Sequence, residues 1–271
     1  MGYLAALVLG IVQGATEFLP VSSSAHLILA RLFFGFDADQ LGMAFDVACH
    51  VGTLVAVVAY FRAELFAMAK AAPAALARDA RGPARMLQLV AVGTVPVVIV
   101  GVLFAGRIED SLRTPWVAVV TLASVGILFL VVERLGPRTA DEGSVTFAQS
   151  LAIGAAQAAA LVPGVSRSGA TIATGMATGL KRDAAARFSF VLGVPAILAA
   201  AAHEGLHLLR AGVTGDQAVM FGIGMAASAV VGYGVIRLFL KYLAGHTLAV
   251  FAWYRIALAA VTAIWLVSGR G

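Results

Sequence analysis

The stretch Pro163-Gly-Val-Ser-Arg-Ser-Gly-Ala-Thr171 interrupts an otherwise apolar segment, 147–180. Proline and glycine break helices, and serine favours the position where a new helix begins. An earlier apolar segment, 3–35, is broken in the same way by Pro20 and the serines that follow it. Unwound backbone at membrane depth is tolerated only where protein or a watery cavity satisfies its polar groups. We therefore predict that both segments form re-entrant helix-turn-helix hairpins.

The composition places these breaks inside a membrane protein. The 271 residues are 61% hydrophobic and 12% charged, with a mean hydropathy of +0.95, whereas soluble domains carry roughly 25% charged residues. This balance excludes an ordinary soluble enzyme, a disordered chain and a nucleic-acid binder. The excess of 19 basic over 14 acidic residues lies in short loops, which indicates membrane topology rather than a nucleic-acid partner.

Outside the hairpins, six apolar segments approach the roughly 20 residues that a spanning helix needs. They are 44–61, 86–106, 115–132, 184–202, 217–236 and 247–268. The longest connector, 62–85, is basic, and we predict a surface helix there. The sequence therefore predicts an all-α polytopic membrane protein that forms a single membrane domain over residues 1–271.

The two halves of the chain are similar. Residues of the same or related type recur at an offset of 143 to 144 positions: Gly10, Gln13, Pro20, Ser22 and Phe45 match Gly154, Gln157, Pro163, Ser166 and Phe188. Each half then holds one hairpin and three spans. Because three is odd, the second half would lie upside down, as in the inverted repeats of transporters. We predict repeats over about 1–135 and 145–271, with chance similarity among apolar segments as the alternative.

Basic residues indicate the orientation, since short cytoplasmic loops carry an excess of lysine and arginine. One side receives twelve: the five of loop 62–85 with Arg134, Arg138, Lys181, Arg182, Arg187, Arg237 and Lys241. The other side receives five: Arg31, Arg107, Arg113, Arg210 and Arg270. We predict that the first side is cytoplasmic, so that the first hairpin opens outward and the second inward.

The second hairpin carries the groups expected of a phosphate site. Arg167 offers a planar fork of donors that matches phosphate oxygens. The segment from Gly164 to Thr171 begins a half-helix, whose free amides favour an anion. Ser166, Ser168 and Thr171 add hydroxyl groups.

The first hairpin carries the complementary groups. Glu17 lies four residues after Gln13, so the two share one helix face. Ser23 and His26 supply a hydroxyl and an imidazole, which together with a carboxylate can activate a nucleophile. If the two hairpin tips meet near the membrane midplane, all these groups share one pocket.

Three further polar residues have structural interpretations. Asp46 and His50 repeat the four-residue spacing at the start of a span, where a helix cap and a packing contact, or support of the site, explain them. Arg255 lies within the last span, where we predict a structural counter-ion.

Gln13-Gly-Ala-Thr-Glu17-Phe-Leu-Pro-Val-Ser-Ser-Ser-Ala-His26 and the stretch ending at Thr171 resemble the two signature motifs of the undecaprenyl-diphosphate phosphatase family, also known as bacitracin-resistance proteins. The resemblance covers essentially the full chain. It implies a multi-pass enzyme of the bacterial cytoplasmic (inner) membrane that hydrolyses undecaprenyl diphosphate to undecaprenyl phosphate and inorganic phosphate. The reaction recycles the lipid that carries cell-wall precursors, and its site is expected to face the outer, periplasmic side.

Carried over position by position, the resemblance makes Glu17, Ser23, His26 and Arg167 the catalytic candidates. The expected substrate contacts are Gln13, Ser22, Ser24, Gly164, Ser166, Ser168 and Thr171. Many members have Glu where this chain has Gln13, which weakens any scheme with two carboxylates on a metal. We assign no metal ligand, and leave open that Mg²⁺ or Ca²⁺ bridges Glu17 and the diphosphate.

Several alternatives stay open at this stage. The nucleophile is Ser23, slightly favoured, or His26, or a water molecule that His26 activates. A transporter or flippase of phosphate or polyprenyl phosphate would use the same inverted architecture. A non-catalytic scaffold would leave the buried charges without a purpose. Membrane lipids are expected partners, and a homodimer is left open.

Overall fold

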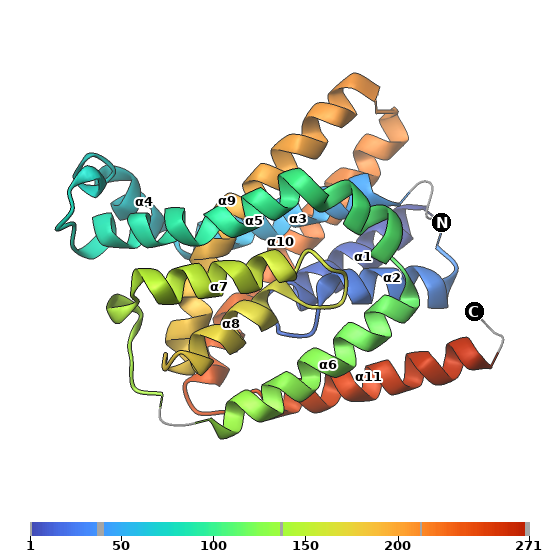
Figure 1. The fold of residues 1–271 in the computed structure, drawn as a ribbon. Helices are drawn as coiled ribbons and strands as arrows, with labels where there is room; N and C mark the ends of the chain where they lie inside the picture. Colours follow the sequence, from blue (N-terminus) through green and yellow to red (C-terminus); the bar gives the residue numbers. More distant parts are fainter. Residues whose placement is uncertain (1, 37–40, 136–137, 212, 269–271) are drawn as a thin grey trace.

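The computed structural model describes residues 2–36, 41–135, 138–211 and 213–268 (Figure 1). Within these ranges the chain is all-α, and the sole β-type pairing is an isolated bridge between Ala140 and Leu180. The α-helices are α1 (Gly2–Thr16), α2 (Ser23–Phe34), α3 (Met43–Tyr60), α4 (Arg62–Lys70), α5 (Gly82–Leu112), α6 (Pro115–Arg134), α7 (Phe147–Ala159), α8 (Arg167–Ala177), α9 (Arg182–Ala211), α10 (Gly215–Leu243) and α11 (Ala249–Val267). Two short 3-10 helices are η1 (Pro73–Leu76) and η2 (Glu142–Ser144).

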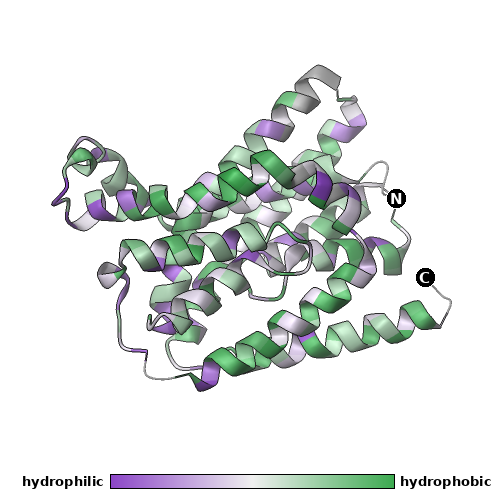
Figure 2. Cartoon of the chain, viewed as in Figure 1, coloured by the Kyte–Doolittle hydropathy of each residue, from purple (hydrophilic) through white to green (hydrophobic). Residues whose placement is uncertain are grey.

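Six of these helices, α3, α5, α6, α9, α10 and α11, are long and apolar enough to cross a membrane. They coincide with the six predicted spans, and α5, α9 and α10 extend beyond the predicted bounds at both ends. Large apolar side chains remain on the outer surface, among them Val102 at 81% and Val230 at 76% exposure. Figure 2 shows such residues along α6 and α11. The chain is therefore a multi-pass membrane protein, as predicted.

The basic connector forms a surface structure, as predicted. Helix α4 and η1 extend away from the bundle together with the start of α5 (Figure 1). The Gln88 side chain on α5 donates to the carbonyl oxygens of Ala75 and Ala77, each at 2.8 Å, and so holds the connector against α5. Of the residues used for the orientation count, Arg270 lies outside the described residues.

One broken helix pair precedes the spans of each half. Helices α1 and α2 have 15 and 12 residues, and α7 and α8 have 13 and 11. Each is shorter than the roughly 20 residues needed to cross a bilayer. The predicted helix-turn-helix pairs are therefore present at both places. That each pair enters and leaves the membrane on one side stays a prediction.

Each broken pair packs against a span of the other half. Helix α1 lies on α10, where a β-carbon on Gly10 would come within 2.6 Å of the Gly224 carbonyl oxygen. Helix α7 lies on α5, where a β-carbon on Gly154 would come within 2.1 Å of the Gly93 carbonyl oxygen. Small residues allow backbones to approach this closely, which is how membrane helices gain packing energy. The two halves thus repeat the same element order and the same kind of contact, while their inverted relation stays a prediction.

Candidate active site

The second helix of each broken pair begins at a strained serine. Ser22 and Ser166 are the N-caps of α2 and α8, and both have a φ of 73°, a region that residues other than glycine rarely occupy. The Ser22 hydroxyl accepts from the Ala25 amide at 3.4 Å, and the Ser166 hydroxyl accepts from the Gly169 amide at 3.1 Å. Such outliers cluster at functional sites, where the surrounding structure holds them.

The two turns are joined through a second pair of serines. The Ser24 hydroxyl accepts a hydrogen bond from the Gly164 amide of the other turn at 3.3 Å. In return, the Ser168 hydroxyl lies 3.1 Å and 3.0 Å from the carbonyl oxygens of Glu17 and Leu19 in the first turn. Backbone groups freed by each break are therefore satisfied by the opposite half, as unwound backbone in a membrane requires.

Arg255 binds both turns at once. Its fully buried guanidinium donates to the carbonyl oxygens of Pro20, at 3.2 Å, and Gly164, at 2.8 Å. It also donates to carbonyl oxygens of Leu122, Thr121 and Val165. The predicted counter-ion role is wrong, because its partners among the described residues are carbonyl oxygens and not a carboxylate. Arg255 is structural, because it donates hydrogen bonds to carbonyl oxygens that the two helix breaks leave without a helical partner.

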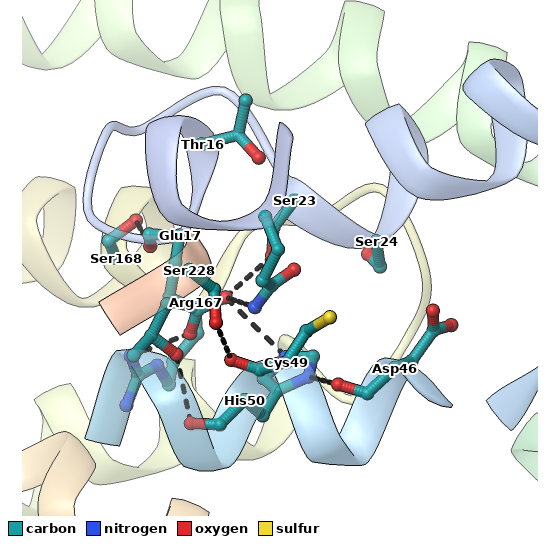
Figure 3. A network of polar contacts seen from close by, with 12 residues as sticks. Thr16, Glu17, Ser23, Ser24, Asp46, Cys49, His50, Arg167, Ser168 and Ser228 are labelled. Carbon is teal, nitrogen blue, oxygen red and sulfur yellow. Dashed lines mark hydrogen bonds and ion pairs between the residues drawn. The ribbon is translucent and has the colours of Figure 1, made fainter. Parts of the chain in front are cut away.

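Glu17 is the centre of the polar network at the meeting point of the turns (Figure 3). Its Oε1 accepts from Arg167 Nη2 at 2.9 Å. Its Oε2 accepts from Ser23 Oγ at 2.6 Å and from Gln13 Nε2 at 2.8 Å, and His50 Nε2 lies 3.4 Å away. The carboxylate is buried, so the Arg167 cation and these hydrogen-bond donors offset the cost of removing its charge from water. The structure thus brings together the acid, the hydroxyl and the guanidinium of the two predicted motifs.

Arg167 keeps one side of its guanidinium free of protein bonds. Its Nη1 atom is buried and has no hydrogen-bond partner among the described residues. A β-carbon on Gly193 of α9 would lie 1.8 Å from this nitrogen, so glycine there makes room for the guanidinium. A buried unpaired donor is costly and calls for an explanation. A bound anionic oxygen would supply the partner.

These groups line a cavity of about 340 Å³. Its polar side is formed by Glu17, Ser22, Ser23, Ser24, Asp46, His50, Arg113, Gln157, Ser166 and Arg167. Its apolar lining comes mainly from α9 and from the turn between α7 and α8, with Met43 and Val47 of α3 and Val97 of α5. A cavity with one charged end and one apolar wall fits an amphiphile whose headgroup is anionic.

Several predicted contacts lie behind the cavity wall rather than on it. Gln13 is fully buried and bonds Glu17, and Ser168 bonds the first turn. The Thr171 hydroxyl is fully buried and donates to the carbonyl oxygens of its own helix, at Arg167 and Ser168. Gly164 has a φ of 88° and binds Ser24 and Arg255. We predicted direct phosphate contacts for Gln13, Gly164, Ser168 and Thr171. The structure corrects this prediction, because these four residues support the residues that line the cavity and do not line it themselves.

His50, rather than His26, is the imidazole beside the acid. His26 does not line the cavity; its Nδ1 lies 2.7 Å from the Ser22 carbonyl oxygen and its Nε2 lies 2.7 Å from the Tyr254 hydroxyl. The expected approach of His26 to Ser23 and Glu17 is therefore not observed. His50 sits on α3 with Nδ1 2.7 Å from the Asp46 carbonyl oxygen and Nε2 facing Glu17. Both of its ring nitrogens therefore face oxygen atoms of neighbouring residues.

Three polar residues near the cavity were given no place in the site by the interpretation of the sequence: Arg31, Arg113 and Gln157. Arg31 and Arg113, which the sequence had assigned only to loops, pair with buried Asp46, for which a structural or supporting role was predicted. Gln157, the counterpart of Gln13 in the second half, is buried in the cavity wall with both side-chain polar atoms unpaired among the described residues. The repeat offset was the signal that pointed to Gln157, whereas no spacing pointed to Arg113.

The described residues contain no group of three or more His, Cys, Asp or Glu side chains placed to hold a metal ion. The carboxylates at the cavity are already engaged: Glu17 by four partners and Asp46 by two arginines. A resident divalent cation therefore fits the described residues poorly, and its involvement stays a prediction for a chelator assay.

The fold defines the class of the protein, a polytopic membrane protein with a polar cavity beside two broken helix pairs. Residues 6–261 match the family model described as bacitracin resistance protein BacA. A protein of Rubrobacter xylanophilus named undecaprenyl-diphosphatase is 50% identical over 97% of this chain and 98% of its own length. Undecaprenyl-diphosphatase 2 of Stutzerimonas stutzeri is 47% identical over 96% and 97%.

A third relative, the undecaprenyl-diphosphatase of Pelotomaculum thermopropionicum, is 42% identical over 98% of this chain and 97% of its own length. The chain therefore belongs to the bacitracin resistance protein BacA family.

Proposed function

We propose that the chain hydrolyses undecaprenyl diphosphate to undecaprenyl phosphate and inorganic phosphate. The observation that carries this proposal is the pairing of Ser23 Oγ with Glu17 at 2.6 Å, beside an arginine with an unpaired buried donor. The names of the three relatives support the substrate. The cavity fits it too, because it has a charged end for the diphosphate and an apolar wall for the lipid.

Ser23 is the nucleophile in the mechanism that this geometry favours. Its hydroxyl already donates to the Glu17 carboxylate, so Glu17 takes the proton as Ser23 Oγ attacks the terminal phosphorus. The new bond joins Oγ to phosphorus, and the anhydride P–O bond breaks. Undecaprenyl phosphate leaves with the electrons of that bond and takes the proton from Glu17, which becomes a carboxylate again. Water then attacks the phosphoserine and gives a proton to Glu17. Glu17 passes this proton to Ser23 Oγ as the Oγ–phosphorus bond breaks, which restores the serine and releases inorganic phosphate.

Arg167 stabilises the charge on the transferred phosphoryl group. Its Nη1 is a donor that no described residue uses, while its Nη2 donates to Glu17. One guanidinium can therefore bind the phosphoryl group and the carboxylate base at the same time. The hydroxyls of Ser22, Ser24 and Ser166 line the same end of the cavity and add donors. Preorganised donors of this kind stabilise transition-state charge more than they would in water.

The lipid chain follows the apolar wall of the cavity. Val97 on α5 and Ile197 and Ala200 on α9 form that wall. Beside them, Ile99 and Leu198 are 52% and 57% exposed on the outer surface of the same helices. A long isoprenoid can therefore pass from the charged end of the cavity to the bilayer between α5 and α9.

The proposed setting is the bacterial cytoplasmic membrane, with the first hairpin and the site facing the outer side. The excess of basic residues on the opposite loops supports this orientation. Hydrolysis there would return the carrier lipid to cell-wall synthesis and would confer bacitracin resistance. The proposal leaves the oligomeric state open, and cross-linking in native membranes would test for a homodimer.

Phosphate release by the purified protein in detergent tests the proposal. Detergent abolishes transport across a membrane but leaves hydrolysis intact, so release distinguishes an enzyme from a transporter or flippase. The assay compares Ser23→Ala, Glu17→Ala, His26→Ala and Arg167→Ala with wild type, each with and without chelator. We expect release by the wild type and its loss in the Glu17 and Arg167 variants. Absence of release by well-folded wild type would contradict the proposal.

A further inference from the structure

A second cavity, of about 630 Å³, lies next to the proposed catalytic cavity. It is lined by residues of α2, of the start of α3 and of the connection between α5 and α6. Two residues, Met43 and Arg113, line both cavities, so the second cavity continues the first. Nothing in the proposed mechanism uses it.

Among the described residues, the charged side chains that line the second cavity are all of one sign. Its described lining residues include two charged side chains, Arg31 and Arg113, and both are cationic. Their shared counter-ion, Asp46, belongs to the lining of the catalytic cavity and not to that of the second. Asp46 thus anchors both guanidinium groups from behind while they face the second cavity. Among the described residues, two arginines and one aspartate leave a net positive charge at this position.

Both arginines retain hydrogen-bonding capacity. A guanidinium has five N–H donors. Arg31 bonds Asp46 through both terminal nitrogens and the Gly42 carbonyl oxygen, but its Nε is buried and has no partner among the described residues. The Arg31 side chain is only 10% exposed, so the unpaired donor lies within the protein. Arg113 bonds Asp46 through Nη2 and is 30% exposed.

We propose that Arg31 and Arg113 form a phosphate-binding site in the second cavity, through which the inorganic phosphate product leaves the catalytic cavity. Paired guanidinium groups with free donors match the oxygens of a phosphate dianion. Arg113 lines both cavities and receives the ion from the side of Arg167, and Arg31 binds it further out. This inference rests on the proposed function, because the phosphate is the product of that reaction.

Single substitutions test the site without breaking the fold. Removing either arginine leaves Asp46 paired with the other, so no buried carboxylate is left uncompensated. Arg31→Gln and Arg113→Gln are therefore the test variants. Arg113→Lys keeps the charge but loses the fork of donors. Arg107→Ala is the matched control, because Arg107 is exposed near the same end of α5 and lines neither cavity.

The first measurement is inhibition of hydrolysis by inorganic phosphate. We expect the inhibition constant to rise about tenfold in Arg31→Gln and Arg113→Gln, as for the loss of a hydrogen bond to a charged group. In both Gln variants this inhibition constant should rise more than the KM for undecaprenyl diphosphate. The inhibition constant of Arg113→Lys should be intermediate between those of the wild type and Arg113→Gln. In Arg107→Ala it should equal that of the wild type. Equal inhibition of the wild type and both Gln variants would overturn the inference and leave the proposed function standing.

The second measurement is direct binding of inorganic phosphate, by calorimetry, to Arg167→Ala, in which the catalytic cavity has lost its main cation. We expect phosphate to bind this variant and to bind about tenfold more weakly when Arg31→Gln is added. Undecaprenyl phosphate is titrated in parallel. If it alone loses affinity, the arginines bind a lipid headgroup and the exit site is refuted. If the wild type releases no phosphate, the proposed function fails, while this titration still decides whether the arginines bind the ion.

Discussion

The two turns at the centre of the molecule have the same construction and different chemistry. Ser22 and Ser166 share a φ of 73°, and the serines two positions later each bond the opposite turn. Between them, at matching positions 144 apart, stand Ser23 and Arg167. Both reach the same carboxylate, Glu17, from opposite halves. The shared frame therefore holds a hydroxyl and a guanidinium on either side of one acid.

The two halves also differ at the position of Glu17, because only the first half has a carboxylate there. Glu17 has Leu161 at its matching position, and Gln13 has Gln157. A second carboxylate opposite Arg167 would neutralise the cation that the phosphate needs. We infer that the halves retained the turn geometry that positions the groups, while each half specialised in one charge. The following predictions test that division.

The largest effect is expected from the cation of the second turn. Arg167→Ala should lower hydrolysis by about 10⁴-fold, the loss typical when an arginine that stabilises a transferring phosphoryl group is removed. Membrane insertion and yield should stay normal, because Glu17 keeps three other partners. Initial rates of phosphate release measure the effect, with Arg107→Ala as the control for loss of positive charge. Turnover within tenfold of wild type would disprove the division of charge between the turns.

The next effect concerns the hydroxyl of the first turn. Ser23→Ala should lower hydrolysis by about 10³-fold, because it removes the nucleophile that Glu17 activates. Ser124→Ala, on the exposed side of α6, is the matched control. Trapping with labelled substrate should yield an acid-stable phosphoserine. An acid-labile phosphohistidine, or a Ser23→Ala variant with nearly full turnover, would transfer the attack to histidine or water.

A smaller effect is expected at His50, which joins the acid of the first turn to α3. Gln at this position can still donate one hydrogen bond to Glu17, whereas Leu cannot. His50→Leu should lower kcat about tenfold, and His50→Gln should retain most of the activity. His246→Leu is the control, because His246 is exposed, stacks on Tyr242 and is not among the residues that line the cavity. Equal loss in His50→Gln and His50→Leu would mean that the imidazole itself transfers a proton.

Much of this arrangement could be predicted from the sequence. Apolar length gave the six spans, and the Pro, Gly and Ser clusters located both breaks. The prediction that the two hairpin tips meet placed Arg167 and Glu17 in one pocket, and the two side chains do form an ion pair. The spans and the breaks depend on local composition and residue spacing, which can be read from the sequence without knowledge of the packing.

The choice between His26 and His50 could not be predicted in the same way. His26 lies within the signature motif and one helix turn from Ser23, but its side chain turns to Tyr254 of α11. His50 reaches Glu17 because of how α3 packs against α1, a contact with no sequence signal. The pairing of Asp46 with Arg113, 67 positions apart, was missed for the same reason.

The smallest effect tests whether the two turns are equivalent as structures. Glycine at position 22 or 166 loses a cap worth only a few tenths of a kcal/mol relative to serine, and it relieves the strain of positive φ. Ser22→Gly and Ser166→Gly should therefore each shift stability by less than about 1 kcal/mol, and in the same direction. Ser22→Ala and Ser166→Ala lose the cap and keep the strain, so each should destabilise by about 1 kcal/mol. Thermal unfolding in detergent at one scan rate measures all four variants. Stability changes of opposite sign in the two halves would show that different interactions hold the two turns. The turns would then share a backbone conformation but not its energetic origin.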